Sequence, residues 1–136
     1  MPRRRYGAMA AGLALVAAVS ACGGLTERQD AVSTAAARFE QAWGEQRFGA
    51  LCSALAPATR DELEQAAKQP CRTAISEEEL TAAGEVRHVD VYGGQARVVL
   101  EHDTLFLAHF PSGWKISAAG CAPVPQQPYQ CKIKGR

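Results

Sequence analysis

Three histidines are the side chains of this sequence best suited to proton transfer, because an unperturbed imidazole titrates at about pH 6.5. They are His88, His102 and His109, and all three fall in segments that the sequence predicts as β-strands. Their spacing matches no metal-ligand motif, and isolated histidines on strands are usually surface residues or hydrogen-bonded residues. We therefore expect no catalytic residue and no metal site, and we keep a role in a ligand pocket as the alternative.

Two widespread catalytic or cofactor-binding motifs are missing from the sequence. No serine stands in a G-x-S-x-G context, so a nucleophile elbow is not expected. Gly93-Gly94 lies between two β-runs and signals a hairpin, and it is not a glycine-rich phosphate loop. The sequence thus predicts a protein without a cofactor that is not an enzyme.

Cysteines supply the clearest covalent chemistry. The chain has five, and four of them, at positions 52, 71, 121 and 131, lie in the region predicted to fold. Four cysteines allow three connectivities, and we favour Cys52–Cys71 with Cys121–Cys131 because each pair then lies within one local unit. Closing a loop of about 20 residues contributes roughly 3 kcal/mol in the chain-entropy model. No CxxC pair is present, which disfavours the alternative of a zinc site.

The first 21 residues have the pattern of a secretory signal peptide. Arg3, Arg4 and Arg5 form a positive start, and Ala8–Val19 is a run of 12 mostly apolar residues. A transmembrane helix needs about 20 apolar residues, so this run is too short to span a bilayer. We exclude residues 1–21 from the fold as a cleaved segment.

Cys22 stands where that segment ends, and two interpretations of it are open. In the first, Val19-Ser20-Ala21 is an ordinary cleavage site, and Cys22 carries a free thiol. In the second, Cys22 is itself processed. Val19, Ser20, Ala21 and Cys22 resemble a bacterial lipobox, in which the cysteine sulfur receives a diacylglycerol and the cysteine becomes the new N-terminus. Two acyl chains give a stable anchor where one does not. Lipidation also accounts for an odd cysteine beside two disulfides.

Charge excludes several kinds of partner. The chain has 15 Lys and Arg and 14 Asp and Glu. Removing the first 21 residues removes three arginines and leaves 12 − 14 = −2 from Cys22 onward. A slightly acidic domain has no electrostatic footprint for nucleic acid. It also has no polybasic patch for anionic lipid, so the expected membrane contact is the lipid anchor on Cys22.

The first half of the mature chain has the apolar period of helices. From Thr26, apolar residues recur at positions 32, 35, 36, 39, 42 and 43, which predicts one long amphipathic helix. A short helix is expected over 47–56. A third is expected from an N-cap at Thr59, where Glu62 completes a capping box, up to Pro70. A fourth is expected from an N-cap at Ser76 to Gly84.

After Gly84 the pattern changes to that of strands. Four runs separated by tight turns, 85–92, 95–102, 104–110 and 114–121, predict an antiparallel meander. The tail from Ala122 holds three prolines and is expected to be an extended coil. Helices followed by strands indicate an α+β fold. The sequence thus predicts a signal peptide at 1–21, a lipidated cysteine and short tether at 22–25, and a single α+β domain at 26–136.

The second half of the sequence resembles small secreted lipoproteins of high-GC Gram-positive bacteria. The resemblance is carried by Leu105–Leu107, Gly113–Lys115, Ala118–Cys121 and Pro128–Cys131, and "AWGEQRFGALCSALAPATRDELE" looks like the helical half of such proteins. It implies an NTF2-like, cystatin-like fold, with a long helix resting on a curved sheet. Members of this group are mostly uncharacterised, so the resemblance implies a fold and a location but no reaction.

Three functions fit these expectations. The first is a non-catalytic binding or accessory module, anchored on the extracytoplasmic face of the membrane and contacting an envelope protein. The second is a small-ligand binder that uses the cone between sheet and helix. The third is an enzyme with acid–base groups in the same cone, as in some NTF2-like proteins. We rank them in that order.

Overall fold

The computed structural model describes residues 24–135, so the predicted signal peptide and Cys22 lie outside the described residues. Helices come first along the chain: α1 (Gly24–Gly44), α2 (Phe48–Ala54), α3 (Pro57–Ala67) and α4 (Cys71–Ser76). Strands follow: β1 (Val86–Tyr92), β2 (Gln95–Leu100), β3 (Thr104–Phe110), β4 (Gly113–Val124) and β5 (Gln127–Lys134). The α+β class predicted from the sequence is confirmed.

The strands form one antiparallel sheet in the order β1-β2-β3-β4-β5, which is a simple meander. The predicted number of four strands is wrong, because the described residues contain five. The tail expected to be coil forms β5, which pairs with an extended β4 from Ala118↔Lys134 to Val124↔Gln127. The meander topology itself is confirmed.

Proline misled the prediction for the tail, because proline lacks the N–H that a central strand needs. β5 is an edge strand, where an absent donor on the outer side costs nothing. Pro128 lies next to the start of β5, and Pro125 precedes Gln126, which takes the left-handed turn conformation at φ 58°. Pro125 and Pro128 thus mark a hairpin turn and an edge strand, and Pro123 lies in β4 at the register shift between Ala122 and Val124.

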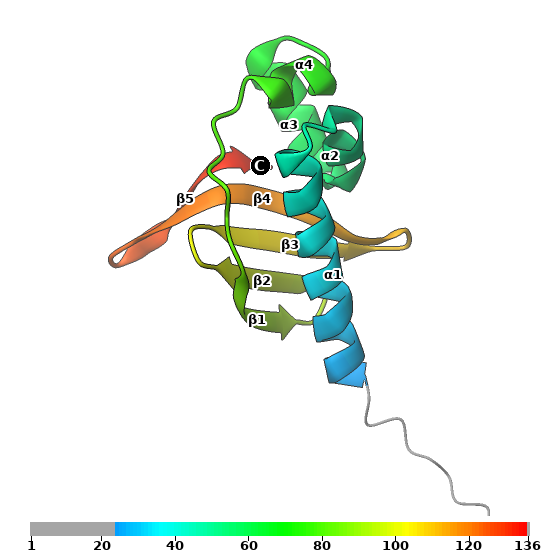
Figure 1. Cartoon of the computed structure of the whole chain (residues 1–136), viewed down its shortest axis with the longest axis vertical. Helices are drawn as coiled ribbons and strands as arrows, with labels where there is room; N and C mark the ends of the chain where they lie inside the picture. Colours follow the sequence, from blue (N-terminus) through cyan, green and yellow to red (C-terminus); the bar gives the residue numbers. More distant parts are fainter. Residues whose placement is uncertain (1–23, 136) are drawn as a thin grey trace, which may run out of the picture.

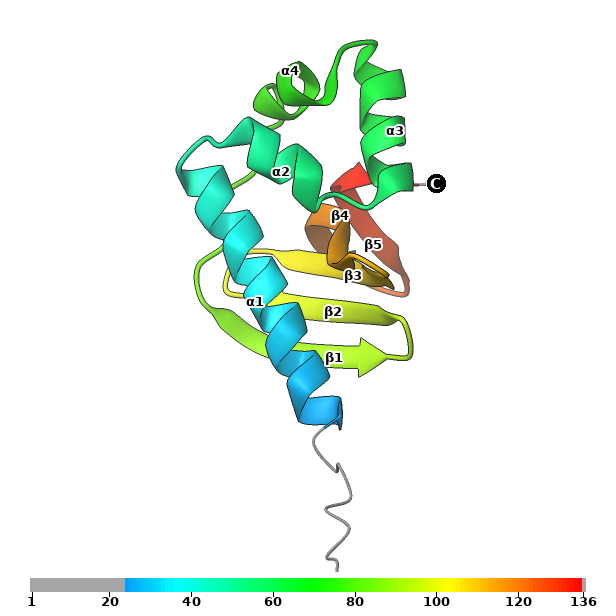
Figure 2. The ribbon, with the colours of Figure 1, turned by 90° about the vertical axis from the view of Figure 1, so that its right-hand side faces the viewer.

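α1 lies across one face of the sheet, and the core lies between them (Figure 1 and Figure 2). From the helix, Val32, Ala36 and Phe39 are at most 1% exposed, as the predicted apolar stripe requires. From the strands, Val98 and Leu107 are equally buried. The space between helix and sheet is therefore filled with side chains.

The start of α3 differs from the prediction. The helix begins at Pro57 with Ala56 as its N-cap, and no side chain caps it. Proline is favoured at the first helical position, where its missing N–H has no partner to lose. Thr59 is instead inside the helix and 1% exposed, and its hydroxyl donates to the Ser117 carbonyl oxygen at 2.9 Å. The predicted capping box at Thr59 is therefore wrong.

The predicted helix over 76–84 is also wrong. Ser76 is the last residue of α4, and residues 77–85, here called the strap, contain neither helix nor strand. Trp43 Nε1 donates to the Leu80 carbonyl oxygen at 3.2 Å, and the His102 N–H donates to the Ala83 carbonyl oxygen at 2.9 Å. Contacts to α1 and to the β2–β3 loop thus replace helical hydrogen bonds.

Two disulfides tie local units together, with the predicted connectivity. Cys52–Cys71 joins α2 to the start of α4, and Cys121–Cys131 joins β4 to β5. The pairs are separated by 19 and 10 residues in sequence. All four cysteines of the described part are therefore oxidised.

Candidate functional site

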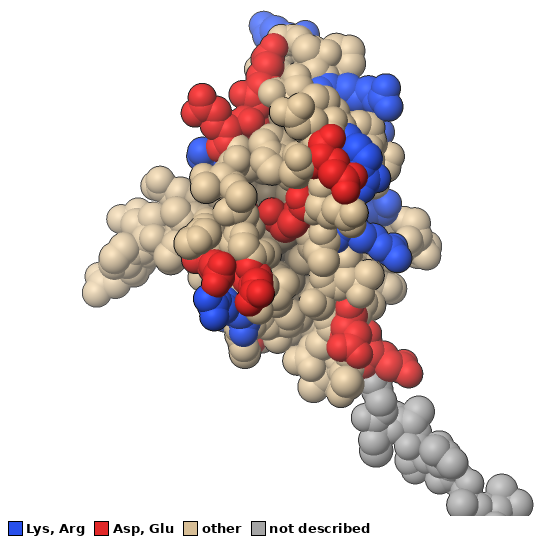
Figure 3. All heavy atoms as spheres, in the orientation of Figure 1, with Lys and Arg blue, Asp and Glu red and all other residues tan. Residues whose placement is uncertain are grey.

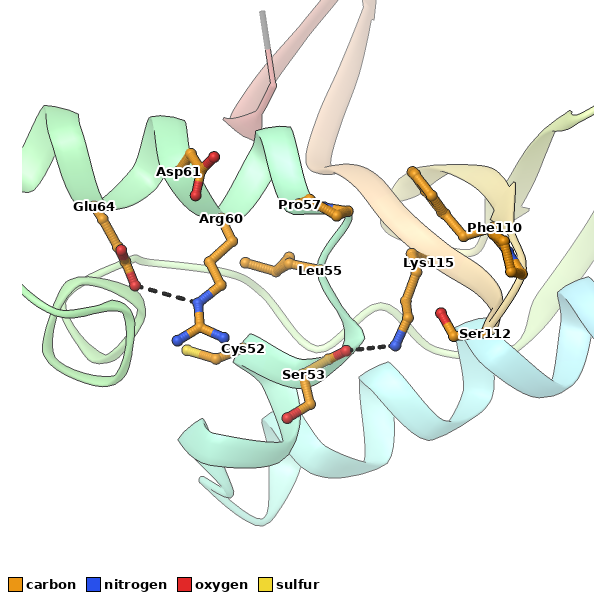
Figure 4. A pocket seen from close by; sticks show the side chains of 11 residues that line it. Cys52, Ser53, Leu55, Pro57, Arg60, Asp61, Glu64, Phe110, Ser112 and Lys115 are labelled. Atoms are coloured by element: carbon orange, nitrogen blue, oxygen red, sulfur yellow. Dashed lines mark hydrogen bonds and ion pairs between the residues drawn. The ribbon is translucent and has the colours of Figure 1, made fainter.

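A surface cavity of about 640 Å³ opens between α2, α3 and the β3–β4 turn. We call it the α2–α3 cleft. Its wall is formed by Cys52, Ser53, Leu55, Pro57, Arg60, Asp61, Glu64, Phe110, Pro111, Ser112 and Lys115 (Figure 4). These residues come from chain segments more than 40 positions apart, so the tertiary fold and not a local motif creates the site.

The link between α2 and α3 fixes the base of the cleft. Leu55 takes an extended conformation after α2 and forms a parallel bridge with Ile116 of β4. The Ala56 N–H donates to the Ile116 carbonyl oxygen at 2.7 Å, and Pro57 then opens α3. The two helices therefore leave the sheet in different directions, and the cleft is the space between them.

A hydrogen-bonded group built around Glu64 closes one wall. Glu64 Oε1 accepts from Arg60 Nε at 3.2 Å and from the Cys71 N–H at 3.1 Å. The Cys52–Cys71 disulfide lies in the same wall. A carboxylate that ties α3 to α4 beside a covalent link holds the Arg60 side chain at the mouth of the cleft.

Lys115 forms the opposite wall. Its Nζ donates to the Ser53 carbonyl oxygen at 2.8 Å, which joins β4 to α2 across the cleft. In Figure 4, Arg60 and Lys115 lie on opposite sides of Leu55. Leu55 is 3% exposed and forms an apolar floor between them, and Phe110 lies beyond Lys115. The cleft thus presents an apolar floor between two cations.

Cys52 and Ser53, two potential nucleophiles in the cleft wall, are already bonded. The sulfur of Cys52 is in a disulfide, and the Ser53 hydroxyl donates to the Gly49 carbonyl oxygen at 3.0 Å. No histidine is among the lining residues, so no nucleophile is paired with an imidazole base there. An apolar floor with a few polar groups at the rim is the usual composition of a recognition site.

Two carboxyl groups form a second polar centre, under the strap. Burial, followed by the negative charge of Asp103, raises the pKa of Glu40 to about 7, and a backbone hydrogen bond to Ala83 opposes the shift. Burial also raises the pKa of Asp103 above its usual value. Asp103 accepts the N–H groups of Thr104, Gly120 and Cys121 at 2.6, 3.1 and 2.8 Å. Through these three hydrogen bonds, the Asp103 side chain links the start of β3 to β4, which is a structural role.

Sequence reasoning missed both centres. Arg60, Glu64 and Lys115 lie on ordinary polar positions, and tertiary contacts such as the Leu55–Ile116 bridge bring them together. For Glu40 the sequence does contain an indication of partial burial. Glu40 lies four residues after Ala36 and three before Trp43, at the edge of the apolar stripe. A carboxylate at such a position is expected to be partly desolvated.

The structure does not bring the three histidines together. The His88 ring bonds Asp90 Oδ1 at 2.7 Å on β1. His102 lines a cavity of about 170 Å³ beside the strap, and His109 packs edge-on against Trp114 with ring centroids 5.0 Å apart. No two of them line the same cavity among those found in the described part.

Within residues 24–135, no group of three or more His, Cys, Asp and Glu side chains is arranged to hold a metal ion. No helix in the same range is both long and apolar enough to cross a membrane. Cys22 lies outside this range.

Comparison with known proteins gives no relative to reason from: no family model, no curated protein and no solved structure matches the chain.

Proposed function

We propose that this protein is a lipoprotein, anchored in the membrane through Cys22, whose extracytoplasmic domain is a non-catalytic binding module for an envelope partner. One observation supports the anchor most strongly. The structure pairs four of the five cysteines as two disulfides, and Cys22 is the fifth. Disulfides persist in oxidising compartments outside the cytoplasm, which suits an exported domain.

Cys22 is also at the position that lipid modification requires. It follows Val19-Ser20-Ala21 at the end of a short apolar run, and a free thiol there would be exposed to oxidation. A diacylglyceryl thioether removes that thiol and supplies two acyl chains, enough for stable anchoring.

Fractionation of the producing cells tests the anchor. The natural protein is expected in the membrane and in the detergent phase of a Triton X-114 partition. Cys22→Ala should remain in the precursor form or leave the detergent phase, whereas the neighbouring change Gly23→Ala should behave like the natural protein. Unchanged detergent partition of a Cys22→Ala protein that has the size of the mature form would remove the anchor from the proposal.

The binding role is supported by the α2–α3 cleft. It combines an apolar floor with Arg60 and Lys115, and arginine is frequent among the residues that dominate protein interfaces. A photo-crosslinking residue at Ser112, on the cleft rim, should capture a defined envelope protein in intact cells. The same residue at Gln130, which is exposed on β5, serves as the control. Equal capture from both positions, or capture from neither, would contradict a partner site in the cleft.

A small-ligand binder is the second candidate, and the size of the cleft favours it. Its volume of about 640 Å³ is within the range of about 300–1,000 Å³ found for ligand sites. Protein purified from native membranes and extracted with solvent should then release a stoichiometric small molecule. Loss of that molecule in Phe110→Ala, combined with no crosslink from Ser112, would favour this candidate over the first.

We also propose that the domain is of the NTF2-like, cystatin-like type and belongs with small lipoproteins of high-GC Gram-positive bacteria. This is supported by a long helix lying across a twisted antiparallel sheet and by the Gly113–Lys115 and Ala118–Cys121 segments (Figure 1). An experimental structure tests the assignment by superposition on NTF2-like domains, and a different strand order would contradict it.

A further inference from the structure

The helix α1 begins two residues after Cys22. A fully extended chain spans at most about 3.6 Å per residue, so the Cα atom of Gly24 lies within about 7 Å of that of Cys22. If Cys22 carries the proposed anchor, its sulfur is at the level of the lipid headgroups. The first turn of α1 then lies close to the membrane surface, without a long tether between them.

The exposed large hydrophobic side chains of the described residues are at this same end of the domain. They are Leu25, which is 59% exposed, and Tyr92, which is 62% exposed. Every other large apolar side chain in residues 24–135 is at least partly covered. Tyrosine is enriched at membrane interfaces, because its ring is apolar and its hydroxyl is polar.

Contacts between α1 and the β1–β2 turn bring Leu25 and Tyr92 to the same end of the domain. The Tyr92 side chain is on the sheet face opposite α1, because Val91 and not Tyr92 pairs with the buried Ala96. Arg28 donates to the carbonyl oxygen of Gly93, the residue after Tyr92. Gln29 Nε2 donates to the Val89 carbonyl oxygen at 3.4 Å. Leu25 lies three and four residues before Arg28 and Gln29, which is the same helix face one turn closer to the N-terminus. Both views of the ribbon show the start of α1 beside the end of β1 (Figure 1 and Figure 2).

We propose that the end of the domain formed by Leu25, Tyr92 and the Gly93-Gly94 turn, here called the basal end, rests on the surface of the lipid bilayer. This inference depends on the proposed anchor at Cys22, which confines the basal end to the headgroup region. Apolar burial of Leu25 and Tyr92 drives the contact.

Charge contributes little to this contact. Glu27 and Asp30 lie in the first two turns of α1, and acidic side chains lie beside the start of the described chain in Figure 3. Arg28 is already bound to the Gly93 carbonyl oxygen and lies 5.7 Å from the centre of the Trp114 ring. The contact should therefore be nearly independent of salt, unlike that of a polybasic segment.

The basal contact sets the height of the α2–α3 cleft. α1 has 21 residues and is about 30 Å long at 1.5 Å per residue. α2, α3 and α4 lie at the end of α1 opposite its start (Figure 1). A bilayer under Leu25 and Tyr92 thus leaves the cleft open to the envelope above the membrane. Its Ser112 side is the nearer one to the bilayer, because Ser112 also lines a cavity with Glu27 and Arg28 of α1.

Hydrogen–deuterium exchange of the natural lipidated protein, bound to phosphatidylcholine–phosphatidylglycerol vesicles, tests the basal contact. The soluble Cys22→Ser protein is the reference. Exchange over residues 91–95 should slow by roughly threefold or more on the vesicles. The β4–β5 turn at residues 124–127 is an internal control on another hairpin and should exchange equally in both samples. Raising the salt concentration from 0.1 to 0.5 M should leave the protection in place.

The double variant Leu25→Ser/Tyr92→Ser separates this inference from the proposed anchor. Both side chains are exposed, so the variant should fold and remain lipidated and vesicle-bound while residues 91–95 lose their protection. If the natural protein is not lipidated by mass, the proposed anchor fails. If it is lipidated and vesicle-bound but residues 91–95 exchange as in Cys22→Ser, the basal contact is refuted while the anchor stands.

Discussion

The carboxyl group of Glu40 on α1 lies close enough to that of Asp103, in the β2–β3 loop, for the charge of Asp103 to disfavour ionisation of Glu40. The strap covers both groups and contributes a backbone hydrogen bond from Ala83 to Glu40. This pair joins the helical half of the domain to the sheet. It also makes the stability of the fold depend on pH in a direction that can be measured.

Stability should fall as pH rises toward 7. The pKa of Glu40 is about 7 in the fold and 4.5 in the unfolded chain. The folded state therefore binds more protons than the unfolded state between these values, and its advantage is lost as pH rises through 7. Thermal unfolding followed by circular dichroism should give a lower Tm at pH 8 than at pH 5. Glu40→Gln should show a smaller fall in Tm between pH 5 and pH 8, whereas the exposed control Glu27→Gln should show the same fall as the natural protein. An identical fall in all three proteins would contradict the raised pKa of Glu40.

Asp103→Asn should destabilise the fold by about 2 kcal/mol, because hydrogen bonds from backbone N–H groups to a charged acceptor are the stronger kind. Thr104, Gly120 and Cys121 would each face a neutral and differently shaped acceptor. The change also removes a negative charge near Glu40 and should lower the pKa of Glu40. Urea unfolding measures the first effect, with Asp61→Asn on exposed α3 surface as the control. If the free energy of unfolding falls no more than in the control, this structural role of Asp103 is refuted.

Gly120→Ala should cost about 1–2 kcal/mol, because a residue with a Cβ is strained in the left-handed region. The φ angle of Gly120 is 65°, and an added Cβ would lie 2.6 Å from Leu80 Cδ2 on the strap. Gly94→Ala is the matched control, since nothing lies within 4 Å of an added Cβ there and its φ is not in the left-handed region. Equal urea midpoints for the two variants would show that the strap does not pack as described.

Removal of the Cys52–Cys71 disulfide by the double change to serine should lower the free energy of unfolding by about 3 kcal/mol for its separation of 19 residues. The link forms part of the cleft wall, so capture of a partner from Ser112 should fall as well. Urea unfolding at 25 °C and the photo-crosslink yield check the two effects. A variant with unchanged stability and unchanged crosslinking would show that the disulfide supports neither the fold nor the cleft.

Lys115→Met should weaken partner capture without unfolding the domain. The bond from Lys115 Nζ to the Ser53 carbonyl oxygen is at the surface, where such contacts contribute at most about 1 kcal/mol. Lys134→Met on β5 removes an equal charge from a residue that does not line the cleft. Crosslinking from Ser112 should fall for the first variant and not for the second. A parallel fall in both would indicate a general effect of charge.

Local patterns predicted the parts of the fold that depend on local physics. The stripe through Val32 and Phe39 needs only helical geometry, and each disulfide joins segments close in sequence. The tail was misread because its prolines disfavour a central strand but are tolerated at an edge. Thr59 was misread because its hydroxyl finds the Ser117 carbonyl oxygen, a partner from a distant strand.

The candidate site could not be predicted for the same reason. The α2–α3 cleft exists because Leu55 bridges Ile116, 61 positions away, and no periodicity in the sequence encodes that pairing. Arg60 and Lys115 acquire a shared role only when this bridge brings α3 close to β4. Glu40 is an intermediate case, since its place beside the apolar stripe is visible in the sequence but its neighbour Asp103 is not.

Mass spectrometry of the mature N-terminal peptide, isolated from membranes of the producing cells, tests the central proposal most directly. We predict a peptide that begins at Cys22 and carries a diacylglyceryl group on its sulfur, while Cys52, Cys71, Cys121 and Cys131 are recovered as two disulfides. A mature peptide beginning at an unmodified Cys22 with a free thiol would contradict the anchor, and with it the placement of the domain on the membrane.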